Sequence, residues 1–245
     1  MLTNKVAIIT GGGTGIGRAC ALRLAREGAS IVINYSRSKD DAEQTKADIE
    51  SIGRKAITCQ ASVTDDAAVR AMIKTTIDTF GRIDILINNA GTTHFVPLND
   101  LEGLQDKFWF DIMDVNVVGM FRCSRAAAPS LKANKGCIVN ITSVAGLTGM
   151  GSSIAYAASK AAAISLTKSL ARVLAPEVRV NSIAPGIVLT RWVADHQDHV
   201  KRYGENTPLG RVANPEDVAE IAYSLVANAG LVTGQTVVVD GGAFL

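Results

Sequence analysis

The 245-residue chain lacks the features that mark several other classes of protein. Its net charge of +2 leaves no basic face for nucleic acid. No apolar run approaches the roughly 20 residues that cross a bilayer. The N-terminus enters a strand pattern at once and has no signal-peptide layout. The sequence therefore predicts a protein that binds neither nucleic acid nor a membrane.

Cysteine and histidine are scarce, at four and three residues. The cysteines form no CxxC pair and stand among apolar neighbours, so we interpret them as buried thiols in a reducing compartment, the cytoplasm. His196 and His199 are three residues apart and could touch one metal ion, but no third ligand candidate stands nearby. We therefore predict a solvated histidine pair and no metal site.

The composition, 47% hydrophobic and 20% charged, suits one packed domain that spans residues 1–245. Short apolar runs of strand type alternate with segments of helical periodicity, without a linker. The predicted strands are 6–10, 30–34, 55–60, 83–88, 137–141, 179–183 and 235–239; the predicted helices are 16–27, 40–51, 65–80, 108–133, 156–174 and 215–227. This alternation predicts an α/β fold, a doubly wound parallel sheet of about seven strands with helices on both faces.

A glycine-rich turn, Gly11-Gly-Gly-Thr-Gly-Ile-Gly17, joins the first strand to the first helix. Backbone N–H groups at such a helix start point at an anion, and glycine lets a diphosphate approach closely. A glycine-rich turn alone is weak evidence, but its place between a strand and a helix predicts a nucleotide-binding turn.

The end of the second strand bears on the choice of nucleotide. An acidic residue there would hydrogen-bond the ribose 2′-hydroxyl of NAD and repel a 2′-phosphate. This chain has Tyr35-Ser36-Arg37-Ser38 and no acid before Asp40, so Arg37 and two hydroxyls could clamp a phosphate. The alternative is an ordinary solvated turn. The pattern favours NADP(H), with NAD(H) as the other candidate.

Tyr156 and Lys160 are four residues apart in a segment of helical character. On a helix this spacing puts the phenol and the ammonium on one face, one turn apart. A neighbouring cation favours the phenolate, so we expect Lys160 to lower the pKa of Tyr156 from about 10 and make it an acid/base group. The pair alone is also typical of an exposed helix surface, so it needs support from the rest of the chain.

Three motifs occur in one order, each where a strand is predicted to end: the glycine turn that follows Thr10, Asn88-Asn-Ala-Gly91, and Ser143 followed by Tyr156-Ala-Ala-Ser-Lys160. Together they resemble the short-chain dehydrogenase/reductase family in its compact single-domain form, and the resemblance runs through the whole chain. It implies a Rossmann-type fold and oxidoreductase activity with NAD(P).

The resemblance also implies roles for single residues. Tyr156 would be the general acid in reduction and the base in oxidation, Lys160 would lower its pKa and hold the nicotinamide ribose, Ser143 would bond the substrate oxygen, and Asn116 would support a water relay. The implied cofactor-binding residues are Gly11, Thr14, Gly15, Ile16, Gly17, Tyr35, Ser36, Arg37, Ser62, Val63, Asn89, Ala90, Gly91, Tyr156, Lys160, Pro185, Gly186, Val188 and Thr190. Ser62 departs from the family pattern, since many relatives have an aspartate there.

The resemblance implies an NADPH-dependent reductase that converts a carbonyl, a 3-oxoacyl group or another ketone, to a secondary alcohol. The loop after the second strand is similar to those of 3-oxoacyl-carrier-protein reductases and bacterial glucose dehydrogenases. The alternative is therefore an NAD(P)-dependent dehydrogenase of a sugar, polyol or secondary alcohol. A nucleotide-binding regulator without chemistry is a third hypothesis, which the presence of Tyr156 and Lys160 disfavours.

The substrate is expected to lie under an irregular segment at about 190–208, which we interpret as a lid. The expected pocket lining is 92–95, 145–153 and the lid residues Arg191, Trp192, His196 and Tyr203. His94 either touches a substrate hydroxyl or is an ordinary loop residue. Small-residue faces at 126–128 and 161–163 suit close subunit contacts, and the family commonly forms homotetramers through these helices; an internal core face is the alternative.

Overall fold

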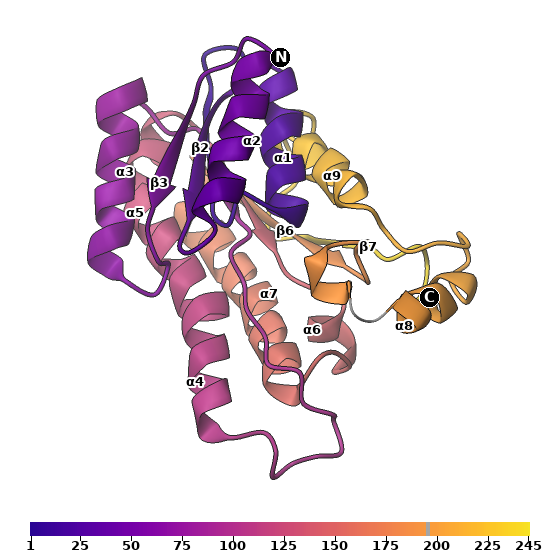
Figure 1. The fold of residues 1–245 in the computed structure, drawn as a ribbon. Helices are drawn as coiled ribbons and strands as arrows, with labels where there is room; N and C mark the ends of the chain where they lie inside the picture. Colours follow the sequence, from indigo (N-terminus) through magenta and orange to yellow (C-terminus); the bar gives the residue numbers. More distant parts are fainter. Residues whose placement is uncertain (195–196) are drawn as a thin grey trace.

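The computed structural model describes residues 1–194 and 197–245, and within them the chain forms a seven-stranded parallel sheet (Figure 1). The strand order is β3-β2-β1-β4-β5-β6-β7, the order of a doubly wound sheet. The bounds are β1 Val6–Ile9, β2 Ser30–Tyr35, β3 Ala56–Gln60, β4 Ile85–Asn88, β5 Cys137–Ile141, β6 Arg179–Pro185 and β7 Thr236–Val239. The predicted fold class is confirmed.

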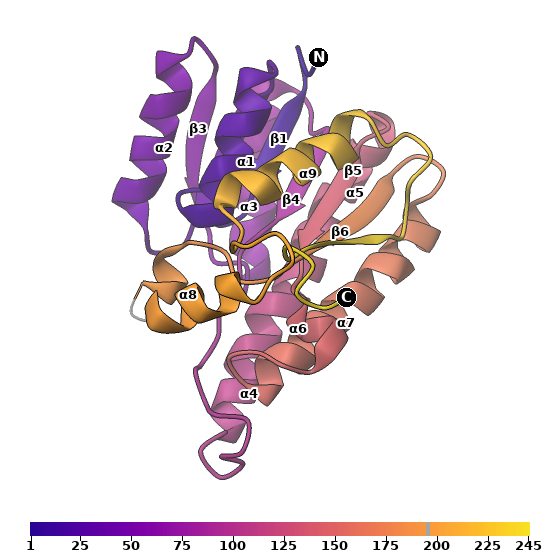
Figure 2. The ribbon, with the colours of Figure 1, turned by 90° about the vertical axis from the view of Figure 1, so that its right-hand side faces the viewer.

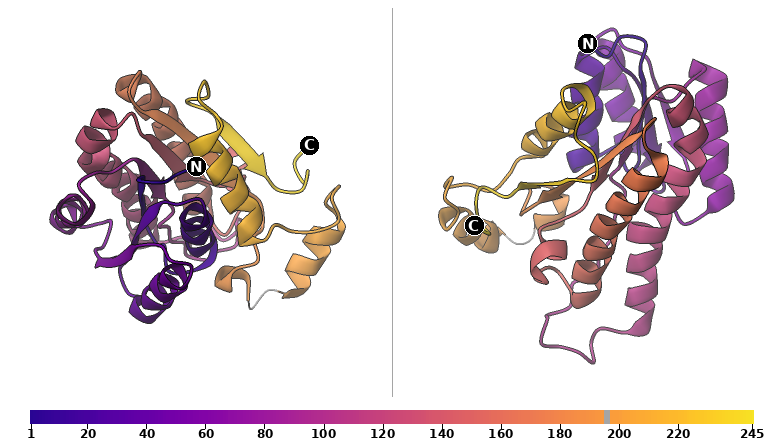
Figure 3. Two further views of the ribbon diagram at one scale, coloured as in Figure 1. Left: turned by 90° about the horizontal axis from the view of Figure 1, so that it is seen from above. Right: turned by 180° about the vertical axis from the view of Figure 1, so that it is seen from behind.

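Helices cover both faces of the sheet, as the two views of Figure 3 show. One face carries α1 and α9, and the other carries α3, α5 and α7. The bounds are α1 Gly15–Arg26, α2 Lys39–Ser51, α3 Asp66–Phe80, α4 Asp106–Met113, a π-helical segment η1 Asp114–Gly119, α5 Met120–Ala133, α6 Ala145–Thr148, α7 Ile154–Leu174, a 3₁₀ turn η2 Arg191–Val193, α8 Gln197–Glu205 and α9 Pro215–Ala227.

The central strands are buried on both faces because each is a continuous apolar run. Successive side chains alternate between the two cores: Ile9 belongs to the core under α1 and α9, while Ile8 and Leu86 belong to the core under α3, α5 and α7. A parallel arrangement brings the carboxyl ends of all strands to one rim. The motifs that follow those strands therefore meet there.

The prediction of one continuous helix over 108–133 is wrong for the middle of this segment. It begins two residues earlier, and residues 114–119 form a π-helical turn between α4 and α5. A π-turn inserts an extra residue into a helix and commonly marks a functional site. Asn116 lies in this turn, where both polar atoms of its amide are hydrogen-bonded. Gly119 ends the turn against β3's loop, and a Cβ there would lie 2.7 Å from Val63 Cγ2.

The segment after β6 interrupts the alternation of strands and long helices. It contains η2 and α8 and lies beside the carboxyl ends of the strands (Figure 2). His196, predicted as half of a solvated pair, lies outside the described residues. The described part of the chain contains no helix long and apolar enough to cross a bilayer. All four cysteines are free and buried, and burial raises the pKa of the Cys20 and Cys123 thiols to about 12.

Candidate active site

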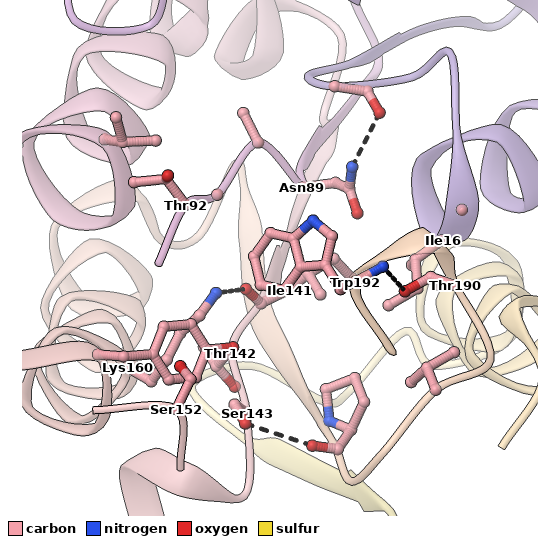
Figure 4. Close-up of a pocket in the computed structure, with 18 of the residues that line it drawn as sticks. Ile16, Asn89, Thr92, Ile141, Thr142, Ser143, Ser152, Lys160, Thr190 and Trp192 are labelled. Atoms are coloured by element: carbon pink, nitrogen blue, oxygen red, sulfur yellow. Dashed lines mark hydrogen bonds between the residues drawn. The ribbon is translucent and has the colours of Figure 1, made fainter. Parts of the chain in front are cut away.

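A cavity of about 1210 Å³ lies at the carboxyl ends of the strands, between the glycine turn and α7 (Figure 4). Its volume exceeds the roughly 300–1,000 Å³ typical of small-molecule pockets, so it has room for a dinucleotide and a substrate together. Of the residues predicted to bind the cofactor, all but Gly17 line it.

The glycine turn is shaped by the absence of side chains. Gly11 and Gly15 have φ values of 61° and 51°, in the left-handed region that favours glycine. A Cβ on Gly13 would lie 2.9 Å from the backbone nitrogen of Ala42 on α2. Gly17 lies beneath the turn, where a Cβ would clash with the carbonyl oxygen of Gly11. Gly17 therefore lets α1 pack against the turn, and Gly13 lets α2 approach it.

Helix α7 places Tyr156 and Lys160 as the sequence predicts. Its N-cap residue Ser153 accepts a hydrogen bond from the backbone N–H of Tyr156 at 3.2 Å. The Lys160 Nζ atom lies 5.5 Å from the centre of the Tyr156 ring, on the same face of the helix. This ammonium donates a hydrogen bond of 2.9 Å to the carbonyl oxygen of Ile141, at the end of β5 (Figure 4).

The expected lowering of the phenol pKa is not met in this structure. Desolvation by the cavity walls raises the pKa of Tyr156 to about 12, against the lowering effect of a hydrogen bond with Ser143. Burial also lowers the pKa of Lys160 to about 8. The ammonium donates its hydrogen bond to the Ile141 carbonyl, and desolvation is the largest effect on the pKa of the phenol. At neutral pH the phenol is protonated and suited to donate its proton.

Ser143 follows β5 and stands beside the phenol. Its Oγ accepts a hydrogen bond of 3.1 Å from the backbone N–H of Ala145, and it lies 3.5 Å from the carbonyl oxygen of Pro185. The Trp192 ring faces Tyr156 edge-on, with centres 6.4 Å apart. The hydroxyl, the phenol and the indole therefore line one end of the cavity together.

Asn116 supports this end from behind and does not line the cavity. Its side chain is buried, accepts a 2.8 Å hydrogen bond from the N–H of Thr92 and donates one of 3.0 Å to the Thr92 carbonyl. It also donates to Ser159 Oγ, whose own hydroxyl donates to the Tyr156 carbonyl. Asn116 thus ties the loop after β4 to the helix that carries the phenol.

The opposite end of the cavity is polar. Tyr35 is buried at the end of β2, while Ser36 and Arg37 are exposed at the mouth. Ser62, the residue that departs from the family pattern, shares a 2.7 Å hydrogen bond with the hydroxyl of Thr64. Asn89 donates to the carbonyl oxygens of Thr10 and Gly11 at 3.0 Å, which joins the second motif to the first.

These features fit a nicotinamide dinucleotide. Gly11, Gly13 and Gly15 line the cavity without side chains, and the side chain of the N-cap residue Thr14 makes no capping hydrogen bond to α1. A diphosphate can therefore approach the backbone at the start of α1. The cavity continues from there to Tyr156 and Lys160. Among the side chains that the structure describes, no group of three candidate metal ligands occurs.

Known proteins share these features over nearly the full length. A profile of the short chain dehydrogenase family matches residues 5–201. The 3-oxoacyl-[acyl-carrier-protein] reductase of Synechocystis is 41% identical, over 98% of this chain and 97% of its own. A ketoacyl reductase named for the granaticin polyketide synthase of Streptomyces violaceoruber is 40% identical, over 98% and 96%. A crystal structure from Burkholderia xenovorans, described as a short-chain dehydrogenase/reductase, superposes with a TM-score of 0.93 at 39% identity, over 98% and 97%.

The chain belongs to the short-chain dehydrogenase family. As a member of this family, it is an NAD(P)-dependent oxidoreductase. The resemblance drawn from three sequence motifs is therefore confirmed, and so is the enzyme class.

Only some of the residues predicted to line the substrate pocket line the cavity of this short-chain dehydrogenase. Those that do are Thr92, Phe95, Ala145, 150–152 and, from the segment 190–208, Arg191, Trp192 and Tyr203. His94 does not: its ring stacks on Phe108, with centres 4.1 Å apart, and its Nε2 lies 3.3 Å from a carboxylate oxygen of Asp111. The interpretation of His94 as a loop residue fits this position.

Several lining residues of the dehydrogenase were missed because no local pattern marks them. Leu98 lies in the irregular loop after β4, and Phe244 comes from the last two residues of the chain. Val115 belongs to the π-turn. Only the tertiary fold brings these side chains to the cavity, so sequence periodicity could not have found them.

Proposed function

We propose that this enzyme reduces the carbonyl of a 3-oxoacyl thioester, or of a similarly apolar ketone, to a secondary alcohol with NADPH. The observation that carries the proposal is the placement of the Tyr156 phenol and the Ser143 hydroxyl together at the end of the cavity whose walls include exposed apolar side chains. The relatives from Synechocystis and Streptomyces violaceoruber, named as 3-oxoacyl and ketoacyl reductases, support the same substrate class.

In the proposed reaction, Ser143 and Tyr156 both point to one substrate oxygen. Bound NADPH would supply the hydride that the carbonyl carbon receives. Tyr156 donates its proton to the oxygen as charge develops there, and Ser143 Oγ hydrogen-bonds the same atom. Lys160, fixed by the Ile141 carbonyl, holds positive charge behind the phenol as the proton leaves. Asn116 acts through the Thr92 backbone and Ser159, as a positioning residue.

We assign nucleotide binding to the lining residues that the sequence predicts. The glycine turn would hold the diphosphate, and Tyr35, Ser36 and Arg37 the adenosine end. Ser62, Val63 and residues 89–91 would line the adenosine side, while Pro185, Gly186, Val188 and Thr190 would hold the nicotinamide. NADPH is favoured over NADH because no carboxylate follows β2 directly and Arg37 forms no ion pair with any described residue.

The character of the substrate end favours an acyl or ketone substrate over a sugar. Its walls include the exposed apolar side chains of Phe95, Leu98, Met150, Trp192 and Phe244. A sugar needs hydrogen-bonding groups at each of several hydroxyls, whereas an acyl chain gains from leaving water against such walls. We also propose that residues 190–208 are a lid, because Trp192, Val193 and Tyr203 of this segment line the cavity.

We further propose a homo-oligomer, a tetramer in the form common to the family, in which α4, α5 and α7 pack against a second copy. Phe110 on α4 and Val173 on α7 are 73% and 67% exposed, and Phe121 on α5 is also exposed. Exposed apolar side chains on neighbouring helices are typical of an association surface. Light scattering on the wild type and on Phe110→Glu tests this, since the charge should reduce the assembly to smaller species.

The loss of NADPH absorbance with a panel of substrates tests the function. Acetoacetyl thioester and an apolar cyclic ketone should be reduced, glucose should not be oxidised, and NADH should serve less well than NADPH. Tyr156→Phe should lose turnover by about 10²–10⁴-fold, the usual contribution of general acid catalysis, and keep its affinity for NADPH. Wild-type turnover in Tyr156→Phe would refute the assignment, and oxidation of glucose alone would refute the substrate class.

A further inference from the structure

Arg191 extends from the start of the lid to the opposite wall of the cavity. Its Nη1 lies 3.2 Å from a carboxylate oxygen of Asp41, and its Nη2 donates a 3.2 Å hydrogen bond to Ser38 Oγ. Asp41 and Ser38 are 150 and 153 residues away in the sequence. Both Arg191 and Ser38 line the same cavity as the glycine turn and Arg37. The guanidinium therefore lies where β2 gives way to α2, at the proposed adenosine end.

The segment that carries Arg191 passes directly over the glycine turn. A Cβ added to Gly15 would lie 3.1 Å from Thr190 Cγ2, the residue immediately before it. Thr190 also accepts a hydrogen bond from the backbone N–H of Trp192, which fixes the first turn of the lid. The position of the guanidinium is thus set by the lid, while its contacts are made with α2.

At the proposed adenosine end, the cavity lining contains two cationic side chains, Arg37 and Arg191. The glycine turn, residues 11–17, contains no charged side chain, and Arg18, the first cation after it, is engaged with Asp48 at 2.7 Å. Arg37 is therefore the cation expected at the cofactor's 2′-position, since Lys39, which opens α2, does not line the cavity. Two carboxylates, Asp40 and Asp41, follow on α2. A carboxylate left without a partner there would repel a 2′-phosphate.

We propose that Arg191 is a second cation for the 2′-phosphate of NADPH, so that a lid residue helps to set the choice of cofactor. This inference rests on the proposed preference for NADPH. Of the five N–H groups of the guanidinium, the contacts with Asp41 and Ser38 use two, which leaves others for phosphate oxygens. Arg191 also neutralises Asp41, the carboxylate nearest to it.

Titration calorimetry with two cofactor fragments tests the proposal without catalysis. Adenosine 2′,5′-bisphosphate carries the 2′-phosphate and adenosine 5′-monophosphate lacks it. The ratio of their affinities should fall about five- to tenfold in Arg191→Ala, a modest loss because the side chain is 59% exposed and water screens its charge. Arg191→Gln should give the same result with most of the side chain kept, and circular dichroism confirms that each variant is folded.

The matched control is Arg202→Ala, an exposed arginine on α8 of the same lid that does not line the cavity. It should leave the ratio unchanged. A ratio that stays at the wild-type value in Arg191→Ala but falls in Arg37→Ala would overturn the inference and leave the NADPH preference standing. Equal loss for both fragments in Arg191→Ala would also overturn it, because the residue would then only hold the lid. A wild type that does not distinguish the fragments would refute the NADPH preference itself.

Discussion

The two ends of the cavity are built in different ways. At the end where we propose catalysis, the catalytic end, Tyr156 and Lys160 come from one helix, and Lys160 is buried and fixed to the end of β5. At the end where we propose that the 2′-phosphate binds, the phosphate end, Arg37 and Arg191 come from two exposed segments, and Arg191 contacts α2 across 150 residues of sequence. A buried, pre-positioned group acts strongly on both chemistry and stability. An exposed, screened group acts weakly on stability, so its effects should be confined to recognition.

The largest effect should come from Lys160→Met at the catalytic end. Turnover should fall by about 10²-fold or more, since the proton leaving Tyr156 loses the charge behind it. The free energy of unfolding should nevertheless increase at pH 7. Burial lowers the pKa of Lys160 from 10.5 to about 8, which corresponds to about 3 kcal/mol of destabilisation. The unpaired Ile141 carbonyl offsets part of this gain, by about 1–3 kcal/mol.

The pH dependence of unfolding separates the cost of burying the Lys160 ammonium from the effect of the unpaired Ile141 carbonyl. Between about pH 8 and pH 10.5, the unfolded chain binds a proton at Lys160 that the folded chain has lost, so the wild type gains stability as pH rises. The advantage of Lys160→Met over the wild type should therefore shrink between pH 7 and pH 10. Thermal unfolding at several pH values measures this. A gap that stays constant with pH would show that the ammonium is not strained by burial.

The second prediction concerns the direction of the reaction. Because the pKa of Tyr156 is raised to about 12, the phenol is ready to give a proton at neutral pH and must first lose one before it can act as a base. The kcat/KM for alcohol oxidation should therefore rise with pH, by up to about tenfold per unit between pH 7 and about pH 8, above which Lys160 loses the charge that favours the phenolate. The kcat/KM for carbonyl reduction should not show this rise. Parallel profiles in the two directions would contradict the prediction.

The same contrast explains what could be predicted from the sequence. Tyr156 and Lys160 share a face because their spacing is a property of the helix itself, and the strand 137–141 and the helix 215–227 have the predicted bounds because apolar periodicity and a proline mark them. The alternation of these elements predicted the parallel sheet with helices on both faces. Features that depend on local periodicity could therefore be predicted from the sequence.

Features that depend on tertiary contacts between distant segments could not be predicted from the sequence. The π-turn carries Asn116, which bonds the Thr92 backbone 24 residues away in the sequence, and the local pattern of 108–133 is typical of a continuous helix. The raised pKa of Tyr156 depends on desolvation by the cavity walls around the phenol. The contact of Arg191 with Asp41 has no local signature at all.

The third prediction tests the support behind the catalytic end. Asn116→Leu keeps the volume but leaves the N–H and carbonyl of Thr92 without partners in a buried site. The free energy of unfolding should fall by about 1–3 kcal/mol, and the KM for the carbonyl substrate should rise because the loop after β4 loses its anchor. Urea unfolding and steady-state kinetics measure the two effects. Asn206→Ala, which removes an exposed amide on the lid, is the control and should change neither.

The smallest effect should come from Asp41→Asn at the phosphate end. The substitution removes the carboxylate that Arg191 contacts, so the guanidinium becomes free for phosphate and one repulsive charge is lost. Affinity for adenosine 2′,5′-bisphosphate should rise about two- to fivefold, affinity for adenosine 5′-monophosphate should not change, and thermal unfolding should stay at the wild-type midpoint. The control is Asp40→Asn, which removes the same charge one residue away, where no ion pair with Arg191 is formed. If both variants raised the affinity equally, the loss of one negative charge from α2 would explain the effect. A rise confined to Asp41→Asn requires the contact with Arg191.

High salt should reduce the gain in affinity in either case, because both carboxylates face water and their charges are screened.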